Sequence, residues 1–425
     1  GAIEPLLQML SGAPGVDVLS SALGALCSMC HGQDEARQLV RLQGGLRRVL
    51  PLLYDKHDRV ASLAAQFFYE VSPNAEVKVA MRLSDALRPL IALLSSPVAD
   101  TRLAAAGALM YATQNEATNQ LKCRELGAIV PLLSLLEAPN EGPPDRECQR
   151  RAAWALSNVV SDPPASRALC AAPTGLSPLV ELMRLPDADM QRPAAAAIFN
   201  ATANDPAAPA ALAAAGGLDI FVVLLRYAAN DENPDVVAWS AGTLLNCAAG
   251  RGADFAAELL AISPPPVAAL VGCLAPDVTD EKYDDAQVAL YELQRANAAG
   301  ALMNLVAVSD GVTAKLLECN GVKALADALA ASREDALGAC FAAGALANVL
   351  LMAPSAAADA FVAVGGAKPM VEALEAPPPP EGAPNSPLPA DAQRAACVAL
   401  LNACAVGGRL RDELLEAGAV DALVG

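Results

Sequence analysis

Apolar and polar residues follow each other along this chain in the spacing of amphipathic helices. In segment 132–136, for example, four leucines surround a single serine, which gives one side of a helix an apolar stripe to bury. Glycines and prolines interrupt such segments at short intervals. The pattern therefore predicts an all-α chain of many short helices, none of which can bury its stripe alone.

One recurring signature is a glycine, or a small polar residue in its place, followed by an apolar stretch that often has proline four positions on. Clear copies start at Gly1, Asp85, Gly127 and Gly365, and looser ones start near Gly44, Gly175, Gly216, Gly321 and Gly418. Glycine suits the left-handed backbone just past a helix end, so it turns the chain between two helices. Proline has no backbone N–H, but it is tolerated in the first turn of the following helix because an N–H there would have no intrahelical partner.

A second signature is an alanine-rich helix that ends in asparagine, at a place we call the frame position. Six frame residues are asparagines: Asn158, Asn200, Asn246, Asn304, Asn348 and Asn402. Three earlier copies have Ser28, Glu70 and Tyr111 there, and successive copies are 41 to 58 residues apart. A period near this length indicates a solenoid, here with a short first helix, a glycine break, a second helix and a longer third helix.

These signatures resemble those of the armadillo repeat family, and the resemblance covers the whole chain. It implies an all-α, right-handed superhelical solenoid with three helices per repeat. We expect residues 1–425 to form a single array of about eight complete repeats with partial repeats at both ends. Because the chain opens in the middle of a repeat, we expect it to be a fragment of a longer protein. HEAT repeats are the alternative, but they have two helices per unit and lack the asparagine.

In armadillo proteins the third helices line a concave groove, so the resemblance places Trp154 and the six asparagines along a partner-binding groove. A carboxamide both donates and accepts, so it can hold a peptide backbone whatever its sequence. Helical layers lie about 8–10 Å apart, and an extended chain advances about 3.3 Å per residue. One amide per layer would meet a bound strand every two or three residues. The alternative is that each amide bridges to the adjacent turn inside the protein.

Tryptophan content separates this chain from the importin-like branch of the family. That branch places tryptophan four residues before each asparagine to hold lysine side chains by cation–π contact. Only Trp154 and Asn158 have this spacing, and Trp239 lies seven residues before Asn246. The chain instead resembles the scaffold branch of axonemal, vacuolar and plant-type proteins. Glycine at this place in three other copies suggests either a shallow groove or close contact between neighbouring helices.

Extra residues between second and third helices lengthen several repeats. The insertions cover residues 138–144, 275–285 and the proline-rich 376–389. Loops at equivalent places emerge along one edge of a solenoid, so we predict a partner-binding edge there. Its acidic residues and tyrosine are Asp277, Asp280, Glu281, Tyr283, Asp284 and Asp285. The alternative is that these are tolerated surface insertions, since lengthening a loop costs little free energy.

Composition narrows the possible partners. The net charge is −18 and the isoelectric point about 4.5, which argues against nucleic acid or an anionic membrane and favours a basic partner. Residues 336–358 carry no charge and are long enough to cross a bilayer. They are in register with the other repeats, however, so we expect no membrane span.

Motifs that would carry chemistry are weak. Cys27, Cys30 and His31 match the spacing for covalent haem attachment, but they lie in a repeat helix and a chance match is the better explanation. The acidic run at 277–285 lacks the glycine and terminal glutamate of an EF-hand loop. With two histidines and no phosphate-binding loop or nucleophile elbow, we expect no enzyme, no metal site and no cofactor.

We therefore expect a non-catalytic scaffold or adaptor that holds other proteins, with basic or helical segments favoured, in a large assembly. The eleven cysteines without paired spacing indicate a reducing compartment, so we expect a cytoplasmic protein. Units such as 298–304 look most similar to armadillo proteins of the cilium or flagellum axoneme. Two alternatives stay open: the substrate-binding region of a U-box ubiquitin ligase, and an importin-like or chaperone-like transport adaptor.

Overall fold

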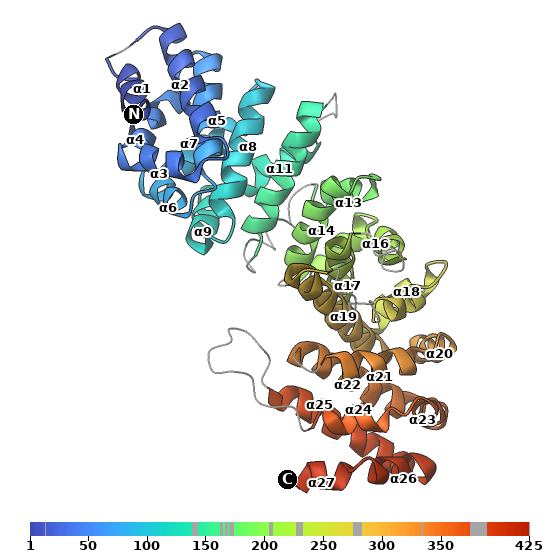
Figure 1. The fold of residues 1–425 in the computed structure, drawn as a ribbon. Coiled ribbons are helices and arrows are strands. Elements are labelled where there is room, and N and C mark those ends of the chain that lie inside the picture. The colour runs from blue at the N-terminus through green and yellow to red at the C-terminus, as the bar shows by residue number, and fades with distance from the viewer. Residues whose placement is uncertain are drawn as a thin grey trace. The chain divides into compact units, whose positions relative to one another are not determined.

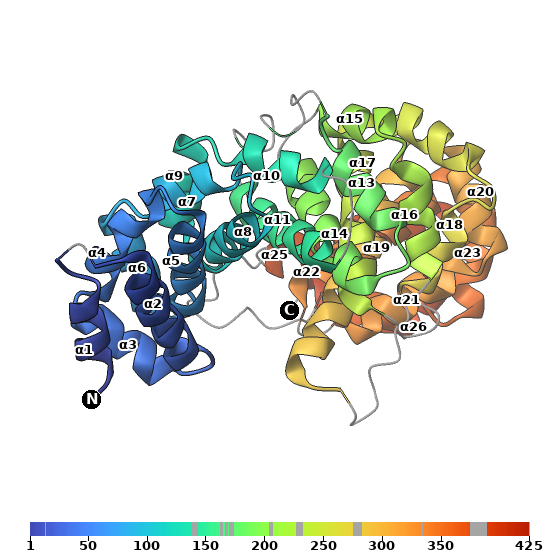
Figure 2. The same cartoon turned by 90° about the horizontal axis from the view of Figure 1, so that it is seen from above.

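The structure is a computed structural model that describes residues 1–12, 14–137, 143–161, 165, 169, 174–203, 207–226, 233–274, 283–332, 335–374 and 389–424. The chain divides into two compact units, Gly1–Asp205 and Pro206–Gly425. Both are built from helices, and the described residues contain no strand. Figures 1 and 2 show the helices of each unit in two views.

Unit 1 repeats a short first helix, a short second helix and a longer third helix. Its third helices are α2, α5, α8, α11 and α14, and each contacts the next along the chain. In order, the elements are α1 (Ile3–Met9), α2 (Val16–Cys30), α3 (Asp34–Leu42), α4 (Gly45–Val49), the 3-10 helix η1 (Leu50–Tyr54), α5 (Asp58–Val71), α6 (Ala75–Leu83), α7 (Leu87–Leu93), α8 (Ala99–Thr113), α9 (Ala117–Glu125), α10 (Ile129–Glu137), α11 (Pro143–Val159), α13 (Ser177–Arg184) and α14 (Ala188–Ala203).

Unit 2 repeats the same pattern with third helices α17, α19, α22 and α25, each again in contact with the next. Its elements are α15 (Ala208–Ala214), α16 (Leu218–Leu225), α17 (Pro234–Ala261), α18 (Val267–Gly272), α19 (Asp285–Val306), α20 (Asp310–Glu318), α21 (Gly321–Ala331), α22 (Ala336–Met352), α23 (Pro354–Ala363), α24 (Ala367–Glu372), α25 (Pro389–Val406), α26 (Gly408–Glu416) and α27 (Ala419–Val424). Helix α17 bends at Gly252, so it contains the third helix of one layer and the first helix of the next.

The breaks between first and second helices have the expected left-handed backbone. Gly127 has a φ of 77°, and Asp85, the small polar substitute, has a φ of 59°. The copy near Gly321 differs by one position, because Asn320 has the left-handed conformation there (φ 57°). An added Cβ on Gly321 would lie 2.4 Å from the Leu316 side chain, so this glycine allows close packing rather than a turn.

Glutamines on third helices cap the second helices that precede them. The side-chain Nε2 of Gln149 donates to the Leu136 carbonyl (3.1 Å), that of Gln191 to the Leu185 carbonyl (2.7 Å), and that of Gln393 to the Leu374 carbonyl (2.9 Å). The last carbonyls of a helix have no partner within the helix. Each of these amides therefore bonds to a carbonyl at the end of a second helix and ties two helices of one layer together.

Basic side chains of first helices cap third helices in unit 1. Arg37 donates to the Glu70 carbonyl (2.7 Å), Lys78 to the Gln114 carbonyl (2.8 Å) and Arg124 to the Val159 carbonyl (3.1 Å). A cation at a helix C-terminus also interacts favourably with the helix dipole. Lys78 is 8 % exposed, so this cap lies inside the packing between layers, and burial of the ammonium lowers its pKa.

Among the described residues, no single helix is long and apolar enough to cross a membrane. The pair α15 and α16, bent by 91°, meets the length and composition test together. The uncharged stretch noted in the sequence is divided between α22 and α23, with Pro354 opening the second of them.

The glutamine caps can be tested with Gln191→Leu. Gln191 is 5 % exposed and also donates to the Met183 carbonyl, so the substitution leaves two carbonyls without this donor. We expect the free energy of unfolding in urea to fall by about 1–3 kcal/mol. The exposed Gln8 bonds only along its own helix, so Gln8→Leu should change it by less than about 0.5 kcal/mol. Equal effects of the two substitutions would contradict the capping role.

Candidate protein-binding face

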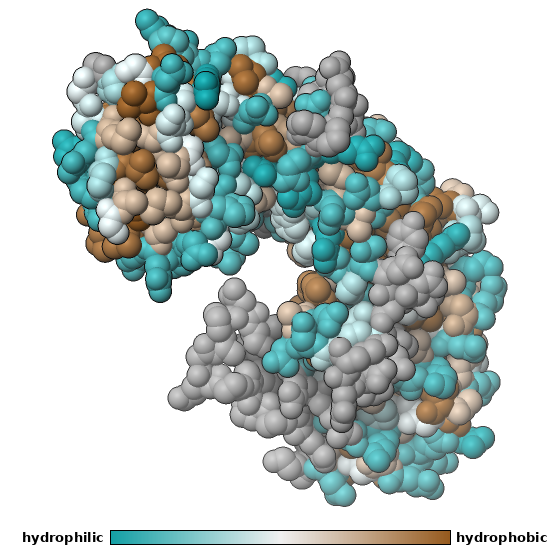
Figure 3. Space-filling model, turned by 45° about the horizontal axis from the view of Figure 1, so that its top comes forward, coloured by the Kyte–Doolittle hydropathy of each residue, from teal (hydrophilic) through white to brown (hydrophobic). Residues whose placement is uncertain are grey.

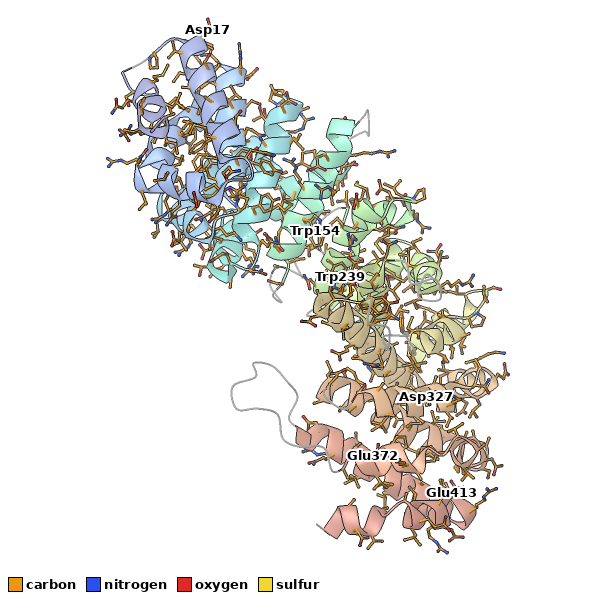
Figure 4. The ribbon with its side chains drawn as sticks, in the orientation of Figure 1. Asp17, Trp154, Trp239, Asp327, Glu372 and Glu413 are labelled. Carbon is orange, nitrogen blue, oxygen red and sulfur yellow. The ribbon has the colours of Figure 1, made fainter. Side chains whose placement is uncertain are left out.

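The residues at the frame position, together with those one and two turns before them, form one side of the third helices, which we call the third-helix face. All six frame asparagines lie in third helices and are half-buried. Trp154 lies on α11 in unit 1 and Trp239 on α17 in unit 2 (Figure 4), and both are half-buried. The predicted groove residues therefore fall at equivalent places within each unit.

Most of these asparagines donate a hydrogen bond to the third helix of the preceding layer. The Nδ2 atoms of Asn200, Asn348 and Asn402 lie 3.0, 2.9 and 2.9 Å from the carbonyl oxygens of the residues one place before the preceding frame residue, which are Ser157, Met303 and Ala347. Asn158 bonds in the same way to Met110 (3.1 Å) and also to the Thr113 hydroxyl (3.1 Å). Each amide thus bridges two stacked layers.

These bridges are the internal hydrogen bonds that we gave as the alternative to partner binding. Each uses the amide nitrogen, while the half-buried side chain keeps part of its surface open. An amide has two N–H donors and an oxygen acceptor, so one bridge does not exhaust it. Asn304 differs, because it makes no side-chain hydrogen bond to the described residues. That the asparagines contact a partner stays a prediction.

A carboxylate takes the place of the asparagine in the second copy. Glu70 is 7 % exposed, and its Oε2 lies 3.1 Å from Nδ1 of His31, which follows the preceding third helix. Its other oxygen accepts from Gln66 at 2.6 Å. In the first copy the Ser28 hydroxyl instead bonds within its own helix, to the Gly24 carbonyl.

Two of the glycines four residues before frame asparagines, Gly300 and Gly344, are covered by neighbouring third helices. An added Cβ on Gly300 would lie 2.9 Å from the Phe341 ring and 3.0 Å from Leu245. On Gly344 it would lie 2.6 Å from the Met303 sulfur. These two glycines therefore permit close packing of layers, and they do not form an open, shallow groove.

Aromatic and arginine side chains from three helices meet on the third-helix face of unit 1. The Arg151 guanidinium lies 4.1 Å from the centre of the Tyr69 ring, a cation–π distance. Glu147 holds Arg151 and Arg150 by hydrogen bonds of 2.7 Å. Burial pushes the pKa of Glu147 up, but the hydrogen bonds and charges of the two arginines outweigh it and lower the pKa. Sequence spacing alone did not predict this cluster.

The predicted edge loops fall largely outside the described residues, including Asp277, Asp280 and Glu281. The structure does describe Tyr283, Asp284 and Asp285. The Tyr283 ring packs edge-on against Tyr291 at 5.1 Å, and Asp284 caps α19 in a reciprocal bond with Gln287. Asp285 is exposed in the first turn of α19. The two aspartates thus favour the start of a helix, and their contact with a partner stays a prediction.

The cysteine pair of the haem-like motif lies in packed surroundings. Cys27 and Cys30 are buried in α2, and burial raises the pKa of their thiols to about 12 and about 11. Both thiols are therefore protonated at neutral pH. Within the described part of the chain, no three or more His, Cys, Asp or Glu side chains are placed to hold a metal ion.

Charge is divided unevenly between the two units. Residues 1–205 contain 18 Lys and Arg against 21 Asp and Glu, whereas residues 206–425 contain 11 against 26. Basic side chains of unit 2 are paired within their own helices, as in Lys323–Asp327 (2.7 Å), Lys368–Glu372 (3.9 Å) and Arg409–Glu413 (3.6 Å), whose acids Figure 4 labels. In Figure 3 apolar residues gather near the N-terminal helices of unit 1. The two units therefore offer different surfaces.

Comparisons with known proteins support the fold. No protein-family model and no curated protein matches the chain. An engineered protein of known structure aligns over 100 % of this chain and 93 % of its own, with a TM-score of 0.79 and 24 % identity. A computationally designed armadillo repeat protein for modular peptide recognition covers 57 % of this chain and 99 % of its own, with a TM-score of 0.51 and 26 % identity. A designed armadillo repeat protein in complex with the peptide (KR)4 covers 58 % of this chain and 100 % of its own, with a TM-score of 0.50 and 25 % identity. The chain has the all-α armadillo solenoid fold.

Packing at the glycines can be tested by comparing Gly300→Ala with Gly24→Ala. Both glycines are four residues before a frame residue, but nothing lies within 4 Å of a Cβ added to Gly24. We expect Gly300→Ala to lower the free energy of unfolding by about 1 kcal/mol or more through overpacking. Gly24→Ala should raise it by about 0.5–1 kcal/mol, because alanine favours helices. Stabilisation by both substitutions would show that Gly300 lies on an open surface.

The bridge between layers can be tested by comparing Asn348→Ala with Asn304→Ala. Of these two residues, only Asn348 has a side-chain hydrogen bond to the preceding layer among the described residues. Loss of this bond should lower the free energy of unfolding by about 1 kcal/mol. The same change at Asn304 should cost less than about 0.5 kcal/mol. Urea unfolding followed by circular dichroism measures both. If the two variants lose equal stability, the hydrogen bond is not what stabilises the stack.

Proposed function

We propose that this protein is a protein-interaction scaffold whose third-helix face binds extended segments of partner proteins. The observation that carries the proposal is the repetition of half-buried asparagines at one position of successive layers. At four of the six positions the amide nitrogen donates to the preceding layer, and all six side chains remain partly exposed. An amide in each layer can bond to the repeating N–H and C=O groups of an extended chain.

The solved structures that align with this chain support such a role. One is a designed armadillo protein described as made for modular peptide recognition, and another was solved with the peptide (KR)4. For this chain we propose protein partners on that likeness together with the asparagines. Binding of this kind requires no catalytic residue.

We further propose that the acidic unit 2 favours basic partners. Its 26 acidic residues outnumber 11 basic ones, and several of the basic ones are already held in ion pairs within their helices. An excess of one charge sign attracts the opposite sign over a Debye length, about 8–10 Å at physiological salt. A basic segment would therefore associate faster with unit 2 than a neutral one.

For cellular context, we propose a cytoplasmic protein that is a structural component of a ciliary or flagellar axoneme, acting in a large assembly. The support is the resemblance of its alanine- and glycine-rich third helices to those of axonemal armadillo proteins. Fluorescent tagging in a ciliated cell tests the placement, and a uniform distribution outside the cilium would count against it.

The groove role can be tested with Asn304→Ala in the full chain, because Asn304 makes no side-chain hydrogen bond to the described residues that the substitution would remove. The probe is the peptide (KR)4, with an alternating Glu-Asp peptide of equal length as control, in fluorescence anisotropy. We expect (KR)4 to bind at least about tenfold more tightly than the acidic peptide. Affinity should fall as salt rises from about 50 mM to about 500 mM.

In the same assay Asn304→Ala should weaken (KR)4 binding by about threefold or more while the melting temperature stays unchanged. Unchanged binding would remove Asn304 from the site. Equal affinity for the basic and acidic peptides would contradict the preference for basic partners.

A further inference from the structure

A hollow of about 700 Å³ crosses the third helices α2, α5 and α8 in unit 1. Its volume lies in the range of sites that bind small molecules or single side chains. It is lined by Ser20, Gly24, Asp58, Arg59, Ser62, Leu63, Gln66, Val98, Asp100 and Leu103. Most of these stand one to three turns before the frame residues, so the hollow lies on the amino-terminal half of the third-helix face.

The wall of the hollow at Gly24 is open. Nothing lies within 4 Å of a Cβ added to Gly24, in contrast to Gly300 at the same position of its own repeat. Leu63 and Leu103 line the hollow from the next two helices and are half-buried. A missing side chain beside two partly exposed leucines leaves room for an apolar group from another molecule.

A buried hydroxyl without a partner also lines this hollow. Ser20 is 3 % exposed, and its Oγ has no hydrogen-bond partner among the described residues. Leaving a buried polar atom unsatisfied costs about 1–3 kcal/mol. Because this Oγ is shielded from solvent, a partner in the hollow does not reach it in this side-chain conformation. The neighbouring Ser62 differs, because its Oγ already accepts a hydrogen bond from Thr101 at 2.9 Å.

Carboxylates stand at the rim. Asp58 and Asp100 are exposed near the starts of α5 and α8 and form no ion pair with the described residues. Arg59 is the single basic residue in the lining, so the rim has a net negative charge. The rim therefore suits a cation next to the apolar wall.

The hollow is separate from the asparagines. The frame residues of these three helices are Ser28, Glu70 and Tyr111, and Glu70 is held by His31 and Gln66. No asparagine of the frame series lines the hollow. Recognition here must therefore use side-chain pockets and charge instead of a row of amides.

We propose that the hollow across α2, α5 and α8 is a second protein-binding site, which takes a segment with a bulky apolar side chain next to an arginine or lysine. The apolar side chain fills the space beside Gly24 and packs on Leu63 and Leu103. The cation pairs with Asp58 and Asp100. Such a site reads side chains, and so gives a scaffold sequence specificity that backbone-holding amides do not provide.

The test uses the full chain, labelled with a fluorophore, on an array of peptides of about twelve residues. Each peptide carries one Leu, Phe or Trp next to one Arg, Lys, Glu or Asp in a Gly-Ser background. Gly24→Phe fills the hollow, and Gly24→Ala is the matched control that leaves it open. Asp58→Asn with Asp100→Asn removes the rim charge. Asn304→Ala is the asparagine variant, which reports on the proposed asparagine groove without removing a bridge between layers that the structure describes.

We expect wild-type protein and Gly24→Ala to bind apolar-plus-basic peptides, and Gly24→Phe to bind them about tenfold more weakly or worse. The aspartate variant should lose the preference for basic over acidic peptides. The asparagine variant should bind these peptides as wild type does, even if it binds (KR)4 more weakly. Binding unchanged in Gly24→Phe, a preference for acidic peptides, or loss in the asparagine variant alone would overturn the second site. A melting curve for each variant separates lost binding from lost fold.

Discussion

The hydrogen bond from a frame side chain to the layer before it is the interaction on which the rest of each unit depends. Successive layers are joined by the chain and by apolar packing between their helices, and a directed hydrogen bond adds a preference for one register. A directed bond from Asn158, Asn200, Asn348 or Asn402 to one particular carbonyl sets the register between two layers. At Glu70 the contact to the preceding layer is instead between the carboxylate and the imidazole Nδ1 of His31. The register then decides which residues share the third-helix face.

Two sets of caps make this stacking possible. Glutamines such as Gln191 satisfy the ends of second helices, and basic residues such as Lys78 satisfy the ends of third helices. Short helices have a large share of unpaired backbone groups, so a solenoid of short helices needs such side chains in every layer. These caps stand at positions other than the frame residues and the hollow beside Gly24, where we propose that partners bind.

The helical layers, their glycine breaks and the frame positions followed from the sequence, because spacing along one helix determines them. Contacts between layers did not. Phe341 covers Gly300 from 41 positions away, and no local pattern pairs the two, so a groove and a packing role for the glycine were equally open. The glutamine caps could have been found, since Gln149, Gln191 and Gln393 each stand nine residues before a frame asparagine. The uneven charge of the two units could also have been found from the sequence, by counting acidic and basic residues separately in its two halves. That both units form one continuous array stays a prediction.

The most direct test of the bridging interaction is hydrogen exchange of the asparagine side-chain amides, followed by nuclear magnetic resonance in the full chain. A hydrogen-bonded N–H exchanges with solvent only when the bond opens. We expect the Nδ2 protons of Asn158, Asn200, Asn348 and Asn402 to exchange measurably more slowly than those of Asn304. Equal and fast exchange at all five asparagines would contradict this expectation, because the layers would then be stacked without these bonds.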